Sequence, residues 1–174
     1  MAVPLTILPY ADALAPHFHA INAAWIEAMF VLEPHDEHVL AHPRAAIVDR
    51  GGDILFVADA AGTIIGTGAL MPTEPGCVEL TKMGVTDTAR GTDAGALLLA
   101  ALIDRAATLP GPELSGVDTL YLLTNRRCEA AIHLYEKAGF VHDAGIMARF
   151  GGGYARCDVA MRYGGSVSPS PSPP

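Results

Sequence analysis

The turn Arg90–Gly95 combines residue types that can bind a phosphate group. Its sequence, Arg-Gly-Thr-Asp-Ala-Gly, contains small residues that let backbone N–H groups approach a ligand closely. A nearly continuous run of alanine and leucine over 94–107 follows and predicts a buried helix. The N-terminus of a helix carries about half a positive charge and free N–H groups. The turn therefore has the features of a pyrophosphate site, and equally those of an ordinary helix start that contains glycine.

This turn is neither of the two common nucleotide motifs. It lacks the Gly-Lys-Ser/Thr ending of a P-loop, and its glycine spacing differs from that of the dinucleotide-binding fingerprint. The elements on either side of the turn must therefore decide between a phosphate site and a plain helix start.

Two other clusters carry no clear chemistry. The sequence His35-Asp36-Glu37-His38 contains metal-ligand types, but charged loops of this kind are usually solvated, and we expect no metal. The cysteines Cys77, Cys128 and Cys157 are widely spaced and form no CxxC pair. We expect reduced packing residues rather than disulfides or ligands.

The elements predicted along the chain alternate between strands and helices. We expect a loop at 33–38 between the first two helices and a C-terminal cap at Gly139. The predicted strands are 5–8, 54–58, 64–70, 78–85, 118–124, 140–142 and 155–162, and the predicted helices are 11–30, about 37–47, 94–107 and 125–137. This order predicts one α/β (α+β) domain over 1–163, followed by a disordered Ser/Pro tail over 164–174.

The segment that follows the phosphate-type turn resembles a known family. Tyr121–Asn125, followed by Ala130–Phe140 with its Leu-Tyr-Glu-Lys-Ala-Gly-Phe ending, is similar to the strand-helix-strand of the GNAT superfamily of N-acetyltransferases, in its bacterial small-molecule branch. Arg90–Gly95 looks like that family's phosphate loop, and Leu80–Val85 like the strand before it. Tyr154–Met161 resembles the closing strand of the branch. The likeness covers about 3–163, with specific motifs from about residue 79 onward.

The resemblance implies a fold and a coenzyme. The fold is a mixed, mostly antiparallel, twisted sheet with helices on both faces, splayed where acetyl-CoA enters. Backbone amides of the phosphate loop would hold the coenzyme A pyrophosphate, and the strand end would pair with pantetheine. The cofactor-binding residues implied in this way are Met83, Gly84, Val85, Arg90, Gly91, Thr92, Asp93, Ala94, Gly95 and Asn125.

The resemblance also implies two catalytic side chains. Glu79 would act as a general base, directly or through water, because a free amine is almost fully protonated at pH 7 and must lose a proton before it attacks. Tyr135 would protonate the departing thiolate. The competing interpretations are a solvated Glu79 at a strand edge and a Tyr135 that is only a core residue. Asn125 would contact the coenzyme arm, which is compatible with capping the next helix.

One residue departs from the family pattern. Asp93 stands where the phosphate loop has its middle glycine. A carboxylate about 4 Å from a phosphate would cost up to a few kcal/mol at an effective dielectric constant near 20. Asp93 could also cap the helix with its own side chain, while Arg90 could offset the repulsion by pairing with Asp93 or with the phosphate. We therefore expect weaker coenzyme binding than in an Asp93→Gly variant.

The acceptor is less defined by the sequence. Glu33 and Asp36 could receive an ammonium group or belong to a solvated loop. Arg126 and Arg127 could contact the coenzyme 3′-phosphate or be exposed helix charges.

Charge and composition restrict the partners. The formal net charge is −8, with 11 Lys and Arg against 19 Asp and Glu. This balance argues against a nucleic-acid partner and slightly favours a cationic amine as the substrate. No stretch is apolar enough to span a membrane, and the start has no signal-peptide pattern, so we expect a cytoplasmic protein. The resemblance allows a homodimer.

Three functions follow for testing. The first is an N-acetyltransferase that moves acetyl from acetyl-CoA to a small-molecule amine by direct attack, without metal. The second is a weak or inactive acyl-CoA-binding module, because Asp93 replaces the loop glycine. The third is an interaction domain that binds no coenzyme, in which the turn only starts a helix.

Overall fold

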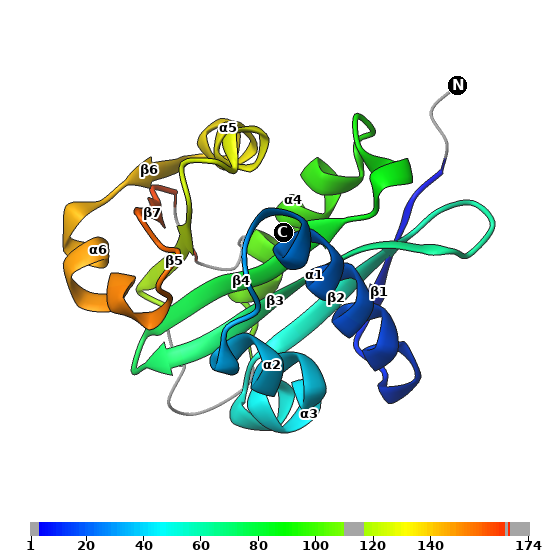
Figure 1. Ribbon diagram of the computed structural model, residues 1–174, viewed down its shortest axis with the longest axis horizontal. Helices are drawn as coiled ribbons and strands as arrows, with labels where there is room; N and C mark the ends of the chain where they lie inside the picture. Colours follow the sequence, from blue (N-terminus) through cyan, green and yellow to red (C-terminus); the bar gives the residue numbers. More distant parts are fainter. Residues whose placement is uncertain (1–3, 110–116, 166, 168–174) are drawn as a thin grey trace, which may run out of the picture.

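A single mixed sheet organises the molecule (Figure 1). The computed structural model describes residues 4–109, 117–165 and 167. Within these residues the sheet has seven strands in the order β1-β2-β3-β4-β5-β7-β6, and all neighbours are antiparallel except β4 and β5. The strands are β1 Thr6–Pro9, β2 Asp53–Ala58, β3 Ile64–Glu74, β4 Cys77–Val85, β5 Thr119–Thr124, β6 Phe140–His142 and β7 Val159–Tyr163. The predicted mixed, mostly antiparallel sheet is confirmed.

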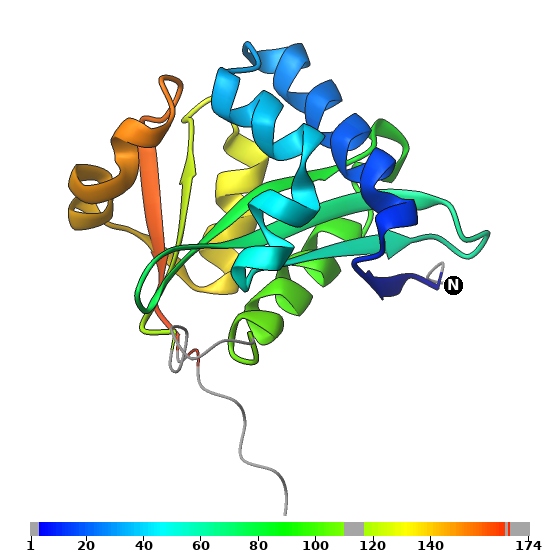
Figure 2. The same ribbon diagram turned by 90° about the horizontal axis from the view of Figure 1, so that it is seen from below.

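Helices cover both faces of this sheet, as Figure 2 shows from below. The first face carries α1 Ala15–Met29, α2 Pro34–Ala41 and α3 Pro43–Ala46, and the opposite face carries α4 Ala94–Ala106 and α5 Glu129–Ala138. The 3-10 turns are η1 Asp12–Leu14, η2 Val48–Arg50, η3 Asp87–Ala89 and η5 Gly151–Gly153. No helix in the described ranges is both long and apolar enough to cross a bilayer.

Strand β2 supplies both hydrophobic cores at once. Its side chains Ile54, Phe56 and Ala58 pack with α1 to α3, while Leu55 and Val57 pack with α4 and α5. This follows from the two-residue period of a strand, whose successive side chains point to opposite faces. A strand buried on both faces reads as a continuous apolar run, which is how 54–58 appears in the sequence.

The sheet opens between β4 and β5. These parallel strands pair only over Cys77–Glu79 and Thr119–Tyr121. Immediately after this pairing, β4 bulges against β3, because Thr67 pairs with Gly84 while Ala69 pairs with Thr81. Lys82 lies in the bulge with a left-handed φ of 50°. A bulge bends and twists its strand, so the end of β4 turns away from β5 and the two strands splay apart.

The chain after α1 differs from the prediction. The expected loop at 33–38 is the start of a helix, because Pro34 occupies the first helical position and Glu33 and Asp36 form a capping box. Asp36 Oδ2 accepts a hydrogen bond from the Glu33 N–H at 2.9 Å. The Pro and the charge cluster are therefore signals of a helix start here, and not of a break.

The C-terminal third also contains an unpredicted helix. This helix, α6 Ala144–Phe150, begins at Asp143, whose side chain accepts a hydrogen bond from Ile146 N. Its apolar side chains Ile146, Met147 and Phe150 pack on β5 and β7. This helix is hard to recognise in the sequence because it contains Gly145 and is only seven residues long.

The predicted C-terminal cap at Gly139 is confirmed, and this glycine has φ 108°. The predicted tail lies outside the described residues at 166 and 168–174.

Candidate active site

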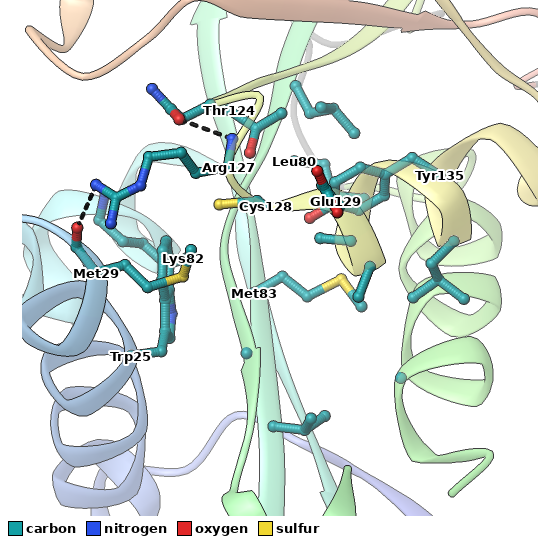
Figure 3. A pocket seen from close by; sticks show the side chains of 18 of the residues that line it. Trp25, Met29, Leu80, Lys82, Met83, Thr124, Arg127, Cys128, Glu129 and Tyr135 are labelled. Atoms are coloured by element: carbon teal, nitrogen blue, oxygen red, sulfur yellow. Dashed lines mark hydrogen bonds between the residues drawn. The ribbon is translucent and has the colours of Figure 1, made fainter. Parts of the chain in front are cut away.

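The splay between β4 and β5 forms a cavity of about 660 Å³ (Figure 3). It is bordered by α1 on one side and by α4 and α5 on the other. The predicted site residues that line it are Met83, Gly84, Val85, Arg90, Gly91, Thr92, Asp93, Gly95, Asn125 and Tyr135. The structure thus brings most of the residues predicted to bind the coenzyme into one cavity.

The start of α4 presents free backbone donors to this cavity. The first bond of the helix runs from Leu97 N to Asp93 O at 2.9 Å, so the N–H groups of Gly95 and Ala96 have no intrahelical acceptor. Both residues line the cavity. Gly91 has φ 76°, a conformation that favours glycine, and no atom lies within 4 Å of the place where a Cβ would stand. The arrangement suits an anion.

Ala94 differs from the other predicted loop residues. Its side chain is fully buried in the core, and its N–H points to Thr92 Oγ1 at 3.3 Å. The Thr92 hydroxyl in turn donates to Ala89 O at 2.6 Å. The Ala94 amide is therefore engaged within the turn, unlike those of the next two residues.

The two charged loop residues do not pair with each other. Arg90 Nη2 lies 3.0 Å from Asp87 Oδ1, in an exposed pair within the turn. The Asp93 side chain makes no cap hydrogen bond to α4 and is exposed at the cavity. Two expectations are therefore wrong: the Asp93 side chain does not occupy the N–H groups of α4, and Arg90 does not pair with Asp93.

Tyr135 is buried between the cavity and the core. It contacts the edge of Phe140, with ring centroids 6.0 Å apart, and it also lines the cavity. Burial raises the pKa of the Tyr135 hydroxyl well above its ordinary value. The side chain therefore stays protonated at neutral pH, as a proton donor must.

Glu79 lies in the middle of the sheet, opposite Met71 on β3 and Tyr121 on β5. Only 4% of the residue is exposed, so the solvated strand-edge alternative is wrong. Burial raises the pKa of the carboxyl group to about 7, although the Lys82 charge and the nearby Thr81 and Tyr154 side chains favour its charged form. A base with a pKa close to the working pH is well suited to proton transfer.

A buried charge network lies beside Glu79. Asp36 is fully buried, and Arg156 donates to its two oxygens at 2.6 and 2.9 Å. Lys82 Nζ lies 2.8 Å from Asp36 Oδ1. Burial would raise the pKa of Asp36, but the Arg156 hydrogen bonds and the Lys82 charge lower it far below its usual range. The carboxylate is therefore ionised and held by two cations.

Glu33 completes this network. Its carboxylate accepts from the Ala155 N–H at 2.8 Å and from Arg156 Nη1 at 3.1 Å. Glu33 and Asp36 do not line the cavity, and both are paired with cations of the chain itself. The expectation that they receive a substrate ammonium is therefore not supported by the geometry.

The loop after β5 joins the two sides of the cavity. Asn125 donates to Arg156 O at 2.7 Å and accepts from Arg127 N at 2.9 Å, which forms a turn and delays the start of α5 to Glu129. Arg127 Nη1 donates to Met29 O at 2.9 Å (Figure 3), and its guanidinium lies 5.0 Å from the Phe30 ring centroid. Arg126 pairs with Asp158 instead.

Several cavity residues were missed by sequence reasoning. The network members Lys82, Tyr154 and Arg156 all line the cavity, as does Trp25 from α1. A Cβ on Gly84 would lie 2.5 Å from Trp25 Cδ1, so this glycine allows α1 to pack closely on β4. Two sequence signals could have pointed to these residues: a lysine, Lys82, within a predicted strand, and the segment Tyr154–Arg156, which resembles the family's closing strand. No local pattern, however, indicates that they pair with Asp36.

A comparison with protein families identifies the class. The model described as acetyltransferase (GNAT) domain matches residues 51–142, which hold the phosphate-type turn, Glu79 and Tyr135. The chain therefore belongs to the GNAT family of acetyltransferases, which are acyl-transfer enzymes.

Similar proteins agree with this class. An "IAA acetyltransferase" of Azospirillum brasilense is 38% identical over 101 residues, which cover 57% of this chain and 61% of that protein. An acetyltransferase of the GNAT family from Staphylococcus aureus has the same fold, with a TM-score of 0.76 at 17% identity over 91% and 98% of the two chains. A phosphinothricin acetyltransferase from Sinorhizobium meliloti, solved with AcCoA, has a TM-score of 0.70 at 17% identity over 98% and 93%.

Proposed function

We propose that the chain is an N-acetyltransferase that transfers acetyl from acetyl-CoA to the amine of a small molecule. The observation that carries this proposal is the single cavity at the splayed strands, where the free amides of α4 and the buried Tyr135 meet. The structure solved with AcCoA supports the choice of coenzyme by analogy of fold.

The residues present fit the coenzyme. The unpaired N–H groups of Gly95 and Ala96 would hold the pyrophosphate, assisted by the positive end of the α4 dipole. The end of β4 at Met83–Val85, which has left β5, offers a strand edge to pantetheine. Acetyl-CoA would supply the acetyl group as a thioester, and no metal is required.

Two side chains would carry the proton transfers. Glu79 would take the proton that keeps the acceptor amine unreactive, since its pKa of about 7 leaves it partly ionised at neutral pH. Tyr135 would donate a proton to the departing thiolate sulfur, because it is buried, protonated and at the cavity wall. Direct transfer of this kind needs no covalent enzyme intermediate.

The cavity lining bears on the acceptor. Its cationic side chains are Lys82, Arg90, Arg127, Lys137 and Arg156, and its only carboxylates among the described residues are Asp93 and Glu129. Three of these cations are paired with carboxylates outside the lining, since Lys82 and Arg156 pair with Asp36 and Arg90 pairs with Asp87. The cavity therefore keeps only a small local excess of positive charge, although the chain as a whole is acidic. This lining suits the coenzyme phosphates and disfavours a polycationic acceptor, so we propose a small amine with at most one positive charge.

The alternative of a non-catalytic acyl-CoA-binding module loses one of its two arguments. The Asp93 side chain leaves the amides of α4 unoccupied, so only the repulsion between its charge and a phosphate still favours this alternative. Transfer itself is tested by incubating the protein with acetyl-CoA and a panel of small amines, then measuring free coenzyme A thiol and the acetylated amine. Amine-dependent release of both products supports the proposal, and coenzyme binding without any release would favour the non-catalytic module.

A further inference from the structure

We propose that Arg127 binds a carboxylate of the acceptor, so that the substrate is an amine that also carries an acid group, as an amino acid does. This inference rests on the proposed function, because it names the class of amine that the same cavity acetylates. Arg127 lies in the turn between β5 and α5, and its side chain lines the cavity next to Met29 at the end of α1 (Figure 3).

Arg127 is one of two cavity cations that have no carboxylate partner in the described parts of the chain, and the other is Lys137. The remaining three pair with Asp36 or Asp87. Glu129 lines the cavity two positions after Arg127, but the two side chains form no ion pair. Two positive charges are therefore left for groups of the bound ligands.

These two cations lie at opposite ends of α5. Lys137 shares a second, smaller cavity with Ala96, whose N–H is one of the donors at the start of α4 that have no intrahelical acceptor. Its position suits a coenzyme phosphate. Arg127 instead precedes α5 and contacts the end of α1, on the other side of the cavity from Tyr135 in Figure 3. This separation leaves the positive charge of Arg127 to the acceptor.

The Arg127 side chain is held in place from several directions. Its Nη1 donates to Met29 O at 2.9 Å, and the guanidinium carbon lies 5.0 Å from the Phe30 ring centroid. At the backbone, the Arg127 N–H donates to Asn125 Oδ1 at 2.9 Å. A side chain that is already held in one position loses little conformational entropy when a ligand binds to it.

The same guanidinium still has donors to offer. Within the described residues, Nη1 is its only nitrogen with a hydrogen-bond acceptor, which is the carbonyl of Met29. An arginine carries five N–H donors in a planar fork, and this fork matches the two oxygens of a carboxylate. Arg127 is also exposed, so an acid group that enters the cavity can reach the remaining donors.

Capping of α1 is the competing role of Arg127. Met29 is the last residue of α1, so its carbonyl belongs to the helix end that lacks intrahelical donors and attracts a cation. This role uses one N–H donor and makes no difference between acceptors. Carboxylate binding does make a difference, because a purely cationic amine would meet an unpaired positive charge where an amino acid would form an ion pair.

The test compares the common L-amino acids with their primary amides, which keep the amine and lose the carboxylate. Acetyl transfer to each is followed by the release of coenzyme A thiol at saturating acetyl-CoA. Arg127→Met keeps an unbranched side chain over Phe30 and removes the charge. Arg126→Met is the matched control, because Arg126 pairs with Asp158 and does not line the cavity.

We expect Arg127→Met to lower kcat/KM by about 10- to 100-fold for the preferred amino acid, but by less than about threefold for its amide. The control should leave both values within about threefold of the wild type. An equal loss with both acceptors would show a capping or packing role, and an unchanged kcat/KM would show no role, so either result overturns the inference. A wild type that acetylates the amides but none of the acids overturns it as well.

The coenzyme 3′-phosphate is the other anion that Arg127 could bind, and 3′-dephospho-acetyl-CoA separates the two. If Arg127→Met raises the KM of acetyl-CoA but not that of the dephospho form, Arg127 binds this phosphate and the inference is wrong. An unchanged KM for both forms, together with the loss for the amino acid, supports the inference. A wild type that acetylates no amine, with or without an acid group, overturns the proposed function instead.

Discussion

The two halves of the cavity are built in different ways. The half that starts α4 is local and exposed, since Arg90 pairs with Asp87 three residues earlier and the donors are backbone amides. The half formed by Lys82, Tyr154 and Arg156 is buried, and the ion pairs that hold it to Glu33 and Asp36 join residues 46 to 123 positions apart in the chain. Binding of a mobile coenzyme arm needs only accessible donors, whereas proton transfer needs side chains held in fixed positions.

The largest effect should follow from breaking the buried half. Asp36→Ala leaves the ammonium of Lys82 without its carboxylate and the guanidinium of Arg156 with Glu33 alone. We expect the free energy of unfolding to fall by about 3–5 kcal/mol, the usual cost of breaking a buried ion pair. Chemical denaturation measures this change.

The matched control lies in the exposed half. Asp87→Ala removes the partner of Arg90, which is an exposed pair worth at most about 1 kcal/mol. Equal destabilisation by the two substitutions would contradict the contrast between the halves.

The next effect concerns the reaction itself. Tyr135→Phe keeps the ring against Phe140 and removes only the hydroxyl. We expect kcat to fall by about 100-fold, within the range of a lost general acid, while the dissociation constant of acetyl-CoA stays the same. Steady-state kinetics and calorimetry separate the two quantities, and an unchanged kcat would remove Tyr135 from the mechanism.

Glu79→Gln should change stability with pH. The folded pKa of Glu79, about 7, lies above its ordinary value, so the folded state binds more protons and loses stability as pH rises through about 4.5 to 7. Gln lacks this cost, and we expect the variant to gain roughly 1–3 kcal/mol relative to the wild type at pH 8 but little at pH 5.

The same pKa governs catalysis. The wild-type kcat/KM should rise with pH through about 7 as Glu79 becomes ionised, and Glu79→Gln should lose this rise. Thermal denaturation and pH–rate profiles measure the two effects. A variant that is less stable than the wild type at pH 8 would show that the carboxylate is not strained by burial.

The smallest effect is expected in the exposed half. Asp93→Asn removes a negative charge that lines the cavity beside the amides of α4. We expect acetyl-CoA to bind about 3- to 10-fold more tightly at low salt, with the gain shrinking at high salt because the site is solvated. Asp104→Asn, on the same helix but outside this cavity, should change nothing. A gain that persists at high salt would contradict a screened charge effect.

The sequence allowed the exposed half to be predicted because its signals are local. The glycine-containing turn, the apolar run of α4 and the Leu-Tyr-Glu-Lys-Ala-Gly-Phe segment each lie within one stretch of chain. The sheet class, α4 and the cap at Gly139 were predicted for the same reason.

The buried half could not be predicted from local patterns. Glu33 and Asp36 were expected to bind an acceptor, but their partners are Arg156 and Lys82, which only the tertiary fold brings close. The bulge at Lys82 depends on pairing with β3 and leaves no local mark. The short α6 was missed because Gly145 lowers its helix propensity and packing on the sheet stabilises it.

The most direct test of the account is calorimetric titration of the wild type, Asp93→Asn and Glu79→Gln with acetyl-CoA. The account predicts a wild-type dissociation constant in roughly the micromolar range, tighter binding by Asp93→Asn and unchanged binding by Glu79→Gln, since Glu79 does not line the cavity. Absence of binding in both the wild type and Asp93→Asn would contradict the coenzyme site, and with it the proposal that this cavity transfers acetyl groups.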